Sequence, residues 1–364
     1  MKICFLAPAN NYHTQKWCHY FTTHNYDVYV ISLTDGQIEN AKVFWLNSKA
    51  TQDSSDFQKL EYLTEFRKVR KLVNEISPDI INVHYATSYG ALAAMAGLHN
   101  YILSVWGADV YDFPRRSFLH RALLKYSLNS AAYIFSTSRA MAKETKKYTA
   151  KSIFVTPFGV DMDLFNPDKR TRVDDEKFVI GTVKKLAPKY GIGEFLKAVH
   201  IVRNERPDIP LHVRIAGKSG KENYGPVYKE LAKHLGISDI VSWLGFIPQA
   251  EAAKEWANMD CGIIFSESES ESFGVSAVEA QAAGIPVIIS DIPGLMEATE
   301  PGLTSIVVPR KDIKQLAQQI IYLYDHPNLR RKVGVNGRLF VSQTYEMNHC
   351  FAKVEDYYHQ LLGV

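Results

Sequence analysis

Several features that mark large protein classes are missing from this sequence. The 364 residues include only four cysteines, Cys4, Cys18, Cys261 and Cys350, which form no Cys-x-x-Cys pair and no zinc-spaced set with histidine. We therefore expect reduced thiols and a cytoplasmic protein. No apolar run approaches the ~20 residues of a membrane span. Residues 1–8 have the pattern of a short strand ending at a proline, not of a signal peptide.

A strong excess of charge of either sign is also missing. Charged residues make up 22% of the chain, and the net charge is +3. Nucleic acid is not an expected partner, because domains that bind it carry strong basic patches. The first loop, residues 8–17, lacks Gly-x-Gly-x-x-Gly, which disfavours dinucleotide binding. The basic segment 115–126 has the pattern of an amphipathic helix, either a solvated face or a peripheral contact with anionic lipid at the inner face of a membrane.

What is present is a regular alternation of apolar, strand-length segments with helical stretches. The expected strands are 2–7, 27–33, 79–84, 101–105, 132–137, 152–156, 178–183, 211–216, 240–244, 260–265, 285–289 and 305–308. This alternation predicts an α/β fold with two parallel, doubly wound sheets. A connector with proline and glycine, residues 156–167, separates the two halves.

The most informative stretch is residues 267–290. An apolar run before it predicts a strand, and its Ser/Glu segment predicts a loop at the strand's carboxyl end, where open α/β sheets bind ligands. A helix follows and ends near Gly284, so its first N–H groups would face the same ligand. Glu271 precedes this helix, and Glu279 lies about two turns into it on nearly the same face. For the glutamates alone, a solvated loop and a satisfied helix carboxylate would be the simpler interpretation.

The whole stretch resembles the Glu-x7-Glu signature of the retaining glycosyltransferases of family 4. That family has the GT-B fold, two Rossmann-like doubly wound domains facing a central cleft. The resemblance implies that Glu271, together with Phe273, Gly274 and Val275, contacts the donor sugar, and that Glu279 binds the ribose of the nucleotide. No metal is expected, because no carboxylate cluster suggests one and the resemblance to GT-B enzymes implies metal independence. The nucleotide sugar is a substrate, so no other cofactor is expected.

The resemblance also implies a division of the chain. The first domain, residues 1–165, would bind the acceptor, and the second, residues 166–345, would bind the nucleotide sugar. The last segment, residues 346–364, would be a helix that crosses back to the first domain.

A basic loop after the strand at 178–183 would hold the leaving diphosphate. The family pattern there is Arg-Leu-x-x-x-Lys-Gly, and this chain has Lys185 at the arginine position and Tyr190 at the lysine position. The resemblance assigns Lys185 to the diphosphate, and Lys189, one residue before Tyr190, is a second candidate. A solvated lysine cluster is the alternative.

Family members place the nucleotide base between two further loops of this half. Gly217, Phe246 and Ile247 are the base-side candidates here, although Phe246 would fit a core position equally well.

The acceptor side carries a weaker signal. Residues 104–110 resemble the family's His-Gly-x-Asp element, with Trp106 in place of the histidine. We predict that His84 and Asp109, which each follow a strand, take the acceptor-side catalytic role. A structural histidine and a helix N-cap are the respective alternatives.

The function that the resemblance implies is retaining transfer of a hexose from a nucleotide sugar, most often a UDP-sugar, to an acceptor hydroxyl. The acceptor would be a glycan or a lipid-linked molecule in cell-surface polysaccharide or glycolipid synthesis. A catalytically silent GT-B subunit of a polysaccharide-assembly complex is one alternative, motivated by the departures at Lys185, Tyr190, Trp106 and Ser305. A nucleotide-sugar epimerase is another.

Overall fold

The computed structural model describes residues 1–47, 64–173, 176–220 and 222–363. The chain divides into two compact units: unit 1 contains Met1–Phe158 and Asn348–Val364, and unit 2 contains Gly159–Met347. These divisions lie a few residues from the boundaries expected at 165 and 346.

Unit 1 is built on a parallel sheet whose described strands follow the order β3-β2-β1-β4-β5-β6-β7. The strands are β1 (Lys2–Leu6), β2 (Asp27–Ser32), β3 (Lys42–Trp45), β4 (Ile80–His84), β5 (Ile102–Val105), β6 (Tyr133–Ser136) and β7 (Ile153–Val155). Most of them are continuous apolar runs, as expected of strands covered by helices on both faces. β3 was not predicted, because this edge strand is only partly buried and its Trp45 is 48% exposed.

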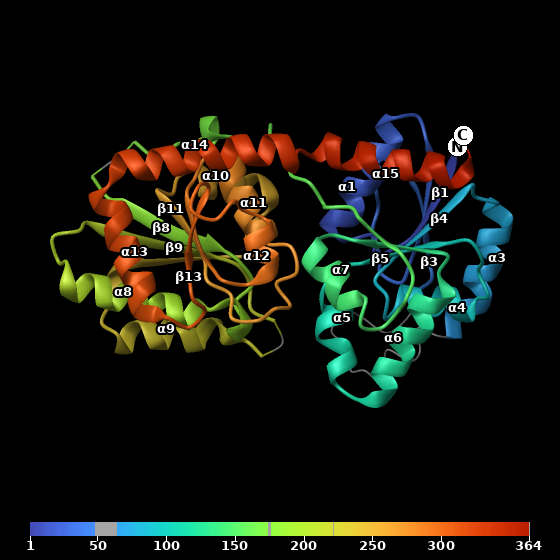
Figure 1. Ribbon diagram of the computed structural model, residues 1–364, viewed down its shortest axis with the longest axis horizontal. Helices are drawn as coiled ribbons and strands as arrows, with labels where there is room; N and C mark the ends of the chain where they lie inside the picture. The colour runs from blue at the N-terminus through green and yellow to red at the C-terminus, as the bar shows by residue number, and fades with distance from the viewer. Residues whose placement is uncertain (48–63, 174–175, 221, 364) are drawn as a thin grey trace. The chain divides into compact units, whose positions relative to one another are not determined.

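Helices cover both faces of this sheet. They are α1 (Tyr12–Thr23), α3 (Phe66–Ile76), α4 (Tyr89–Met95), α5 (Ala108–Tyr111), η2 (Phe113–Arg115), α6 (Phe118–Ser130), α7 (Arg139–Thr145) and α15 (Met347–Leu362). In Figure 1, α1 and α15 lie on one side of unit 1, and α3, α4 and α6 lie on the other. The second group contributes buried apolar side chains to one core with the sheet.

The last helix, α15, packs on the sheet of unit 1 although it follows unit 2 in sequence. Tyr358 is 0% exposed, and its ring stacks on Phe21 at a centroid distance of 5.3 Å. Asn82 Nδ2 donates a hydrogen bond of 2.5 Å to the Tyr358 hydroxyl. On the surface side, Tyr20 donates to Glu355 at 2.9 Å. Apolar and polar contacts therefore hold the chain's last helix to this unit.

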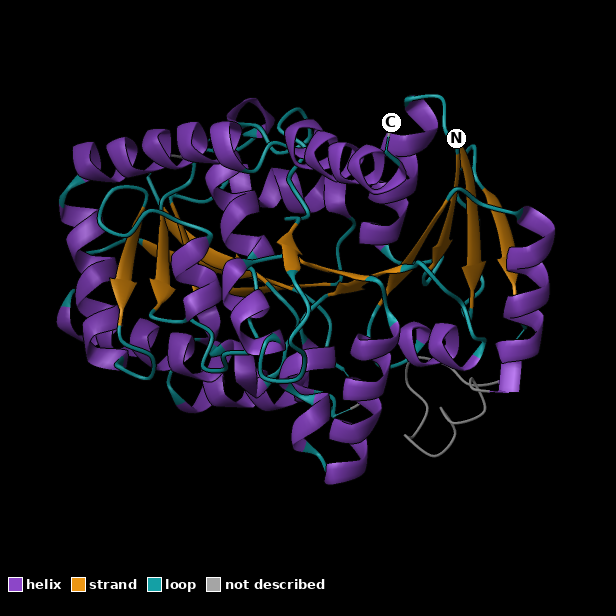
Figure 2. Cartoon of the chain, turned by 45° about the vertical axis from the view of Figure 1, so that its right-hand side comes forward, coloured by secondary structure: helices purple, strands orange, loops and turns teal. Residues whose placement is uncertain are grey.

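Unit 2 has a second parallel sheet, with the described strands in the order β10-β9-β8-β11-β12-β13. The strands are β8 (Phe178–Val183), β9 (Leu211–Ala216), β10 (Val241–Gly245), β11 (Cys261–Ile264), β12 (Val287–Ser290) and β13 (Ser305–Val308). Every strand expected in this half is present. Figure 2 shows the strands of each unit between layers of helices. The predicted α/β class with two doubly wound sheets is confirmed.

The helices of unit 2 complete its two layers. They are η3 (Pro167–Lys169), η4 (Pro188–Tyr190), α8 (Ile192–Glu205), α9 (Tyr224–His234), η5 (Ser238–Ile240), α10 (Gln249–Ala257), α11 (Val275–Ala282), α12 (Pro293–Glu297), α13 (Ile313–Asp325) and α14 (Pro327–Thr344). The main core of the unit joins α8, α9 and α13 to the sheet. Among the described residues, no helix is both long and apolar enough to cross a membrane.

Candidate functional site

A buried ion pair lies at the carboxyl end of the unit 2 sheet. Glu271, in the loop after β11, is 7% exposed, and its Oε2 lies 2.7 Å from Nζ of Lys184. Ser266 Oγ donates a longer hydrogen bond, 3.3 Å, to the same oxygen. Burial opposes the positive charge of Lys184, but Glu271, Tyr190 and Glu279 outweigh it and raise the pKa of Lys184 above its ordinary value. The lysine therefore stays charged at neutral pH.

Lys184 was not among the residues predicted from the sequence, and its neighbour Lys185 was. Lys185 is exposed, and its Nζ lies beside Gly220 in the loop after β9. The two lysines follow β8 directly, and successive side chains of an extended segment point in opposite directions. This alternation indicates that only one of them can reach the loop after β11, but it does not say which.

Two ammonium groups lie near the ring of Tyr190. Lys184 Nζ lies 4.8 Å from the centroid of its ring, and Lys189 Nζ lies 5.3 Å from it. These distances are in the range of cation–π contacts. Lys189 also donates a hydrogen bond of 3.3 Å to Ser270 Oγ. The structure thus brings Lys189 to the acidic loop as well, at the residue directly before Glu271.

The helix predicted after the acidic loop is α11, and it begins at Val275. Gly274 caps it with a φ of +75°, and a Cβ at this position would lie 2.8 Å from Leu295 Cδ2, so both conformation and space favour glycine. Ser276 Oγ donates to the carbonyl of Val183 at 2.9 Å, which ties the helix start to the end of β8. The first N–H groups of a helix have no partner within it. Because Ser276 is in the first turn of α11 and Val183 directly precedes Lys184, the hydrogen bond brings the start of this helix to the segment that carries Lys184.

The other residues of this segment have different surroundings. Glu279 is 6% exposed and acts electrostatically on Lys184, so both glutamates of the pair lie near one cation. Phe273 is 2% exposed, and its ring packs edge-on against Tyr345 at 5.2 Å. The side chain of Phe273 thus belongs to the core of unit 2, and only its main chain borders the helix start.

Two glycines let the neighbouring loops approach this site. Gly191 has a φ of +67°, and a Cβ on it would lie 1.8 Å from the carbonyl oxygen of Phe265 at the end of β11. Gly217, with a φ of +148°, would place a Cβ 1.8 Å from the carbonyl oxygen of Lys184. A side chain at either position would displace main chain. Gly217, predicted at the base side, therefore fixes the loop that holds Lys184.

The other two base-side candidates follow β10. Phe246 is 68% exposed, and Lys218 Nζ lies 5.2 Å from the centroid of its ring. This exposure excludes the core position that the sequence also allowed for Phe246. Ile247 is partly buried.

The acidic loop is more than a solvated surface. Glu267 is hydrogen-bonded to Glu194 of α8, and burial followed by this carboxyl contact raises the pKa of Glu267 to about 7. Lys311 Nζ lies 3.8 Å from Glu267, and Arg310 lies 3.6 Å from Glu269. The acidic loop is therefore held by a hydrogen bond to α8 and by ion pairs with the segment after β13.

In unit 1, Asp109 is enclosed by main-chain donors. It is 1% exposed and accepts hydrogen bonds from the N–H groups of Ala86 at 3.0 Å, Gly107 at 2.8 Å and Trp106 at 3.2 Å. Burial raises the pKa of Asp109, against the lowering effect of these hydrogen bonds. The carboxylate thus joins the loops after β4 and β5, which is a structural task.

His84 is enclosed by aromatic rings. It is 0% exposed, with ring centroids at 5.4 Å from Phe5, 5.0 Å from Trp17 and 4.8 Å from Trp106. Burial, and then the charge of His13, lowers the pKa of His84 to about 3, so its ring is neutral. Neither ring nitrogen of His84 has a hydrogen-bond partner among the described residues, so the structure does not show the hydrogen bonds of a structural histidine. Asp109 lies in the first turn of α5, whose N-cap is Gly107, so it is not the N-cap itself, although its main-chain hydrogen bonds give it a structural role. Contact of either residue with an acceptor stays a prediction.

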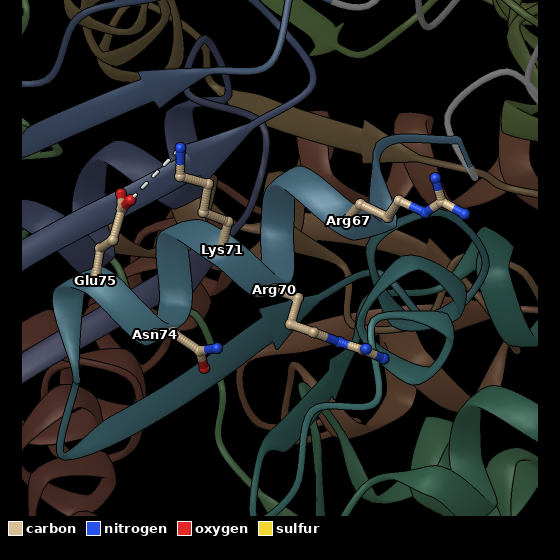
Figure 3. A pocket seen from close by; sticks show the side chains of 5 residues that line it. All are labelled: Arg67, Arg70, Lys71, Asn74 and Glu75. Atoms are coloured by element: carbon tan, nitrogen blue, oxygen red, sulfur yellow. Dashed lines mark ion pairs between the residues drawn. The ribbon is translucent and has the colours of Figure 1, made fainter.

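A pocket of about 450 Å³ lies on α3 of unit 1, and none of the candidate site residues lines it. Figure 3 shows its lining side chains, Arg67, Arg70, Lys71, Asn74 and Glu75. Lys71 Nζ lies 3.8 Å from Glu75 Oε1. All five residues come from one helix, and charges of both signs are mixed there. We assign this pocket no function.

Two family models match the chain. The model described as "Glycosyl transferase 4-like" matches residues 2–138, and the model "Glycosyl transferases group 1" matches residues 166–340. A curated relative, the D-inositol 3-phosphate glycosyltransferase of Arthrobacter sp. (strain FB24), is 32% identical over 298 residues, which are 75% of this chain and 68% of the relative. The protein of the same name from Paenarthrobacter aurescens (strain TC1) is 30% identical over 217 residues, 57% of this chain. The chain spans about half, 52%, of that relative's length.

Solved structures share the fold. Sucrose-phosphate synthase from Thermosynechococcus elongatus superimposes with a TM-score of 0.84 at 17% identity, covering 100% of this chain and 99% of its own. Anabaena HepE, in complex with UDP and glucose, gives a TM-score of 0.82 at 18% identity, covering 98% and 99%. These likenesses establish the fold, and it is the predicted GT-B fold.

Proposed function

Because this chain belongs to the family 4 type of glycosyltransferases, we propose that it transfers a hexose from a UDP-sugar to an acceptor hydroxyl with retention of anomeric configuration. UDP is the first choice of nucleotide because HepE, which has the same fold, was solved with UDP and glucose. In this proposal unit 2 binds the nucleotide sugar, unit 1 contributes to acceptor binding, and no metal takes part.

The observation that carries the proposal is the buried cation beside the start of α11. Negative charge develops on the diphosphate as its bond to the sugar breaks. Groups of fixed positive potential stabilise that charge best when they are already in position and shielded from water. Lys184 meets both conditions, since its side chain is 13% exposed and Glu271 fixes its Nζ at 2.7 Å. The first N–H groups of α11 add donors to the same place.

The glutamates suit donor binding better than nucleophilic attack. Glu271 is held by Lys184 and by Ser266, which lowers its availability to form a bond with the sugar. We propose that Glu271 instead accepts hydrogen bonds from sugar hydroxyls, and that Glu279 does so from the ribose. The acceptor hydroxyl would then attack from the face that the nucleotide leaves, and an oxygen of the leaving phosphate would take its proton. This arrangement needs no enzyme nucleophile.

Tyr190 is one of the four departures that motivate the silent-subunit alternative. That residue stands where the family pattern has a lysine, but Lys184 brings an ammonium group to within 4.8 Å of the Tyr190 ring. A cation is therefore present at the site despite the substitution. An epimerase would need the same donor site and is distinguished by its product.

Calorimetric titration of UDP, GDP and ADP tests the donor half of the proposal. We expect one nucleotide, UDP, to bind with micromolar affinity, about −8 kcal/mol. Glu279→Ala should weaken this binding by about tenfold or more, as the loss of a charged hydrogen bond implies. Exposed Glu230→Ala in α9 is the matched control and should leave binding unchanged. If no nucleotide binds, the donor-site assignment fails and the silent-subunit alternative takes its place.

Product analysis tests the reaction. Incubation of the protein with a UDP-sugar, with and without candidate acceptors, should give a glycoside of retained configuration only when an acceptor is present. A changed sugar nucleotide formed without an acceptor would instead identify an epimerase. We extend the proposal to a glycan or lipid-linked acceptor of cell-surface polysaccharide or glycolipid synthesis, and to peripheral contact of the protein with an anionic membrane.

A further inference from the structure

One surface of unit 1 combines exposed apolar side chains with positive charge. It consists of η2 and α6, and we name it the α6 surface. Phe118 is 77% exposed, Leu119 is 64% exposed and Tyr126 is 48% exposed. The first two are adjacent at the start of α6, and Tyr126 follows two turns later on the same side of the helix. In Figure 1, α6 lies on the opposite side of unit 1 from α15.

The charge of the α6 surface has a single sign. Its cations are Arg115, Arg116, Arg121 and Lys125. The sequence contains no aspartate or glutamate between Asp112 and Glu144. Glu144 pairs with Arg115 at 3.4 Å, at the margin of the surface. Neither Arg121 nor Lys125 makes an ion pair with any residue that the structure describes, so their charge is available to a partner.

Helix α3 of the same unit shows what a basic but merely solvated face looks like. It carries four cations, Arg67, Lys68, Arg70 and Lys71, yet none of its large apolar side chains is exposed. Acidic neighbours also offset its charge, since Lys68 lies 2.7 Å from Glu65 and Lys71 lies 3.8 Å from Glu75. Helix α6 differs on both points, because three of its large apolar side chains are exposed and its Arg121 and Lys125 have no acidic partner among the described residues. Exposed neighbouring apolar groups ringed by cations fit the boundary between lipid headgroups and acyl chains.

We propose that the α6 surface binds anionic phospholipid membranes, with Phe118 and Leu119 inserted among the acyl chains and Arg121 and Lys125 against the headgroups. Tyr126 would lie at headgroup depth, where amphipathic rings are favoured. This inference gives a surface to the membrane contact of the proposed function and rests on that function for its purpose. Binding itself requires neither donor nor acceptor, so it can be measured without any transfer reaction.

Co-sedimentation with vesicles tests the inference on the full chain. Vesicles of equimolar phosphatidylcholine and phosphatidylglycerol are compared with vesicles of phosphatidylcholine alone. We expect binding to the anionic vesicles at least about tenfold tighter than to the neutral ones, and weakened by salt. The double variant F118S/L119S and the double variant R121Q/K125Q should each lose about tenfold or more of the wild-type affinity for anionic vesicles.

The matched control is K68Q/K71Q, which removes two cations from α3 and leaves the α6 surface intact. It should bind vesicles within about twofold of the wild type. Equal losses in the α3 and α6 charge variants would replace the proposed surface by general attraction of a basic unit. Equal binding to neutral vesicles, or none to either kind, would overturn the inference. Circular dichroism and UDP titration of each variant separate these outcomes from misfolding and from failure of the donor site.

Discussion

The two sheets of this protein share one topology, but different kinds of side chain lie at the carboxyl ends of their strands. In unit 2 the end of β8 is followed by a charged lysine, Lys184, held at 2.7 Å from the carboxylate of Glu271. In unit 1 the ends of β4 and β5 are closed by the neutral ring of His84 and by Asp109, whose oxygens accept main-chain hydrogen bonds. One scaffold therefore offers a charged lysine at one site, and a neutral histidine beside an enclosed aspartate at the other.

The difference indicates how the same fold divides its tasks. Charge that is already paired and partly buried costs little to keep in place and can be offered to an incoming diphosphate. Enclosed aromatic and histidine side chains make rigid ends for strands but present few reacting atoms. The fold alone does not decide which strand ends carry reactive groups. That depends on the side chains that follow each strand.

Removal of the charge in unit 2 should give the largest effect. Lys184→Met is expected to lower kcat/KM for sugar transfer by about 100-fold or more, as for loss of one group that stabilises a developing anion. Lys185→Met, the exposed neighbour, should lower it by less than about fivefold. Steady-state transfer assays of both variants make the comparison. Equal losses would mean that Lys184 is not the specific cation that stabilises the leaving diphosphate.

The stability of the Lys184 variant needs its own control. Lys184→Met leaves Glu271 charged without its partner in a poorly solvated place, which destabilises by several kcal/mol on average. The double variant K184M/E271Q removes both charges and should recover most of the lost thermal stability while staying inactive. Recovery of activity in the double variant would mean that the cation serves only to neutralise Glu271.

A second, smaller effect is expected on stability, because the loops of unit 2 approach each other closely at Gly191. Gly191 and Gly236 both have a φ of +67°, but a Cβ on Gly191 would meet the Phe265 oxygen at 1.8 Å, while nothing lies within 4 Å of a Cβ on Gly236. Gly236→Ala should cost about 1 kcal/mol of unfolding free energy for its backbone conformation alone. Gly191→Ala should cost about 2 kcal/mol more, because main chain must move. Urea denaturation of the two variants measures the difference, and equal costs would show that the loop yields freely.

Much of the site in unit 2 could be predicted from the sequence, because the residues that form it lie close together in one segment. The helix α11 and the positions of Glu271 and Glu279 around its start follow from a pattern of loop, glycine and apolar period within a single segment. Phe246 could be placed after β10, but its exposure could not be predicted, because an aromatic residue suits a core as well. Lys184 was missed because the direction of a side chain after the last strand residue depends on the loop packed beside it, here through Gly217.

Unit 1 was read less well, and again the reason is physical. The edge strand β3 has no buried apolar run to mark it, since Trp45 is half exposed. Asp109 and His84 follow strands as site residues do, and sequence position cannot tell a carboxylate satisfied by main-chain N–H groups from a reacting one. Only the hydrogen bonds from Ala86 and Gly107 make that distinction.

The neutral ring of His84 in unit 1 predicts the smallest effect, a loss of stability of the folded protein in acid. The pKa of His84 is about 3 in the folded protein, below the ordinary 6.5, so the unfolded chain binds a proton that the folded chain does not between these pH values. The contribution of His84 to stability is complete above pH 6.5 and is lost progressively as the pH falls toward 3. At pH 5 the loss should be about 2 kcal/mol.

Urea denaturation at pH 7.5 and pH 5 measures this loss in the wild type and in His84→Phe, which keeps an aromatic ring in the same packing. The variant should lose less stability between the two pH values, whatever its stability at pH 7.5. His234→Phe is the control, because His234 lies exposed on α9 and replacing it should not alter the acid loss. An unchanged acid loss in His84→Phe would mean that water or a proton reaches His84 in the folded chain. The end of β4 would then be open, and the contrast between the two units would reduce to the ion pair of unit 2.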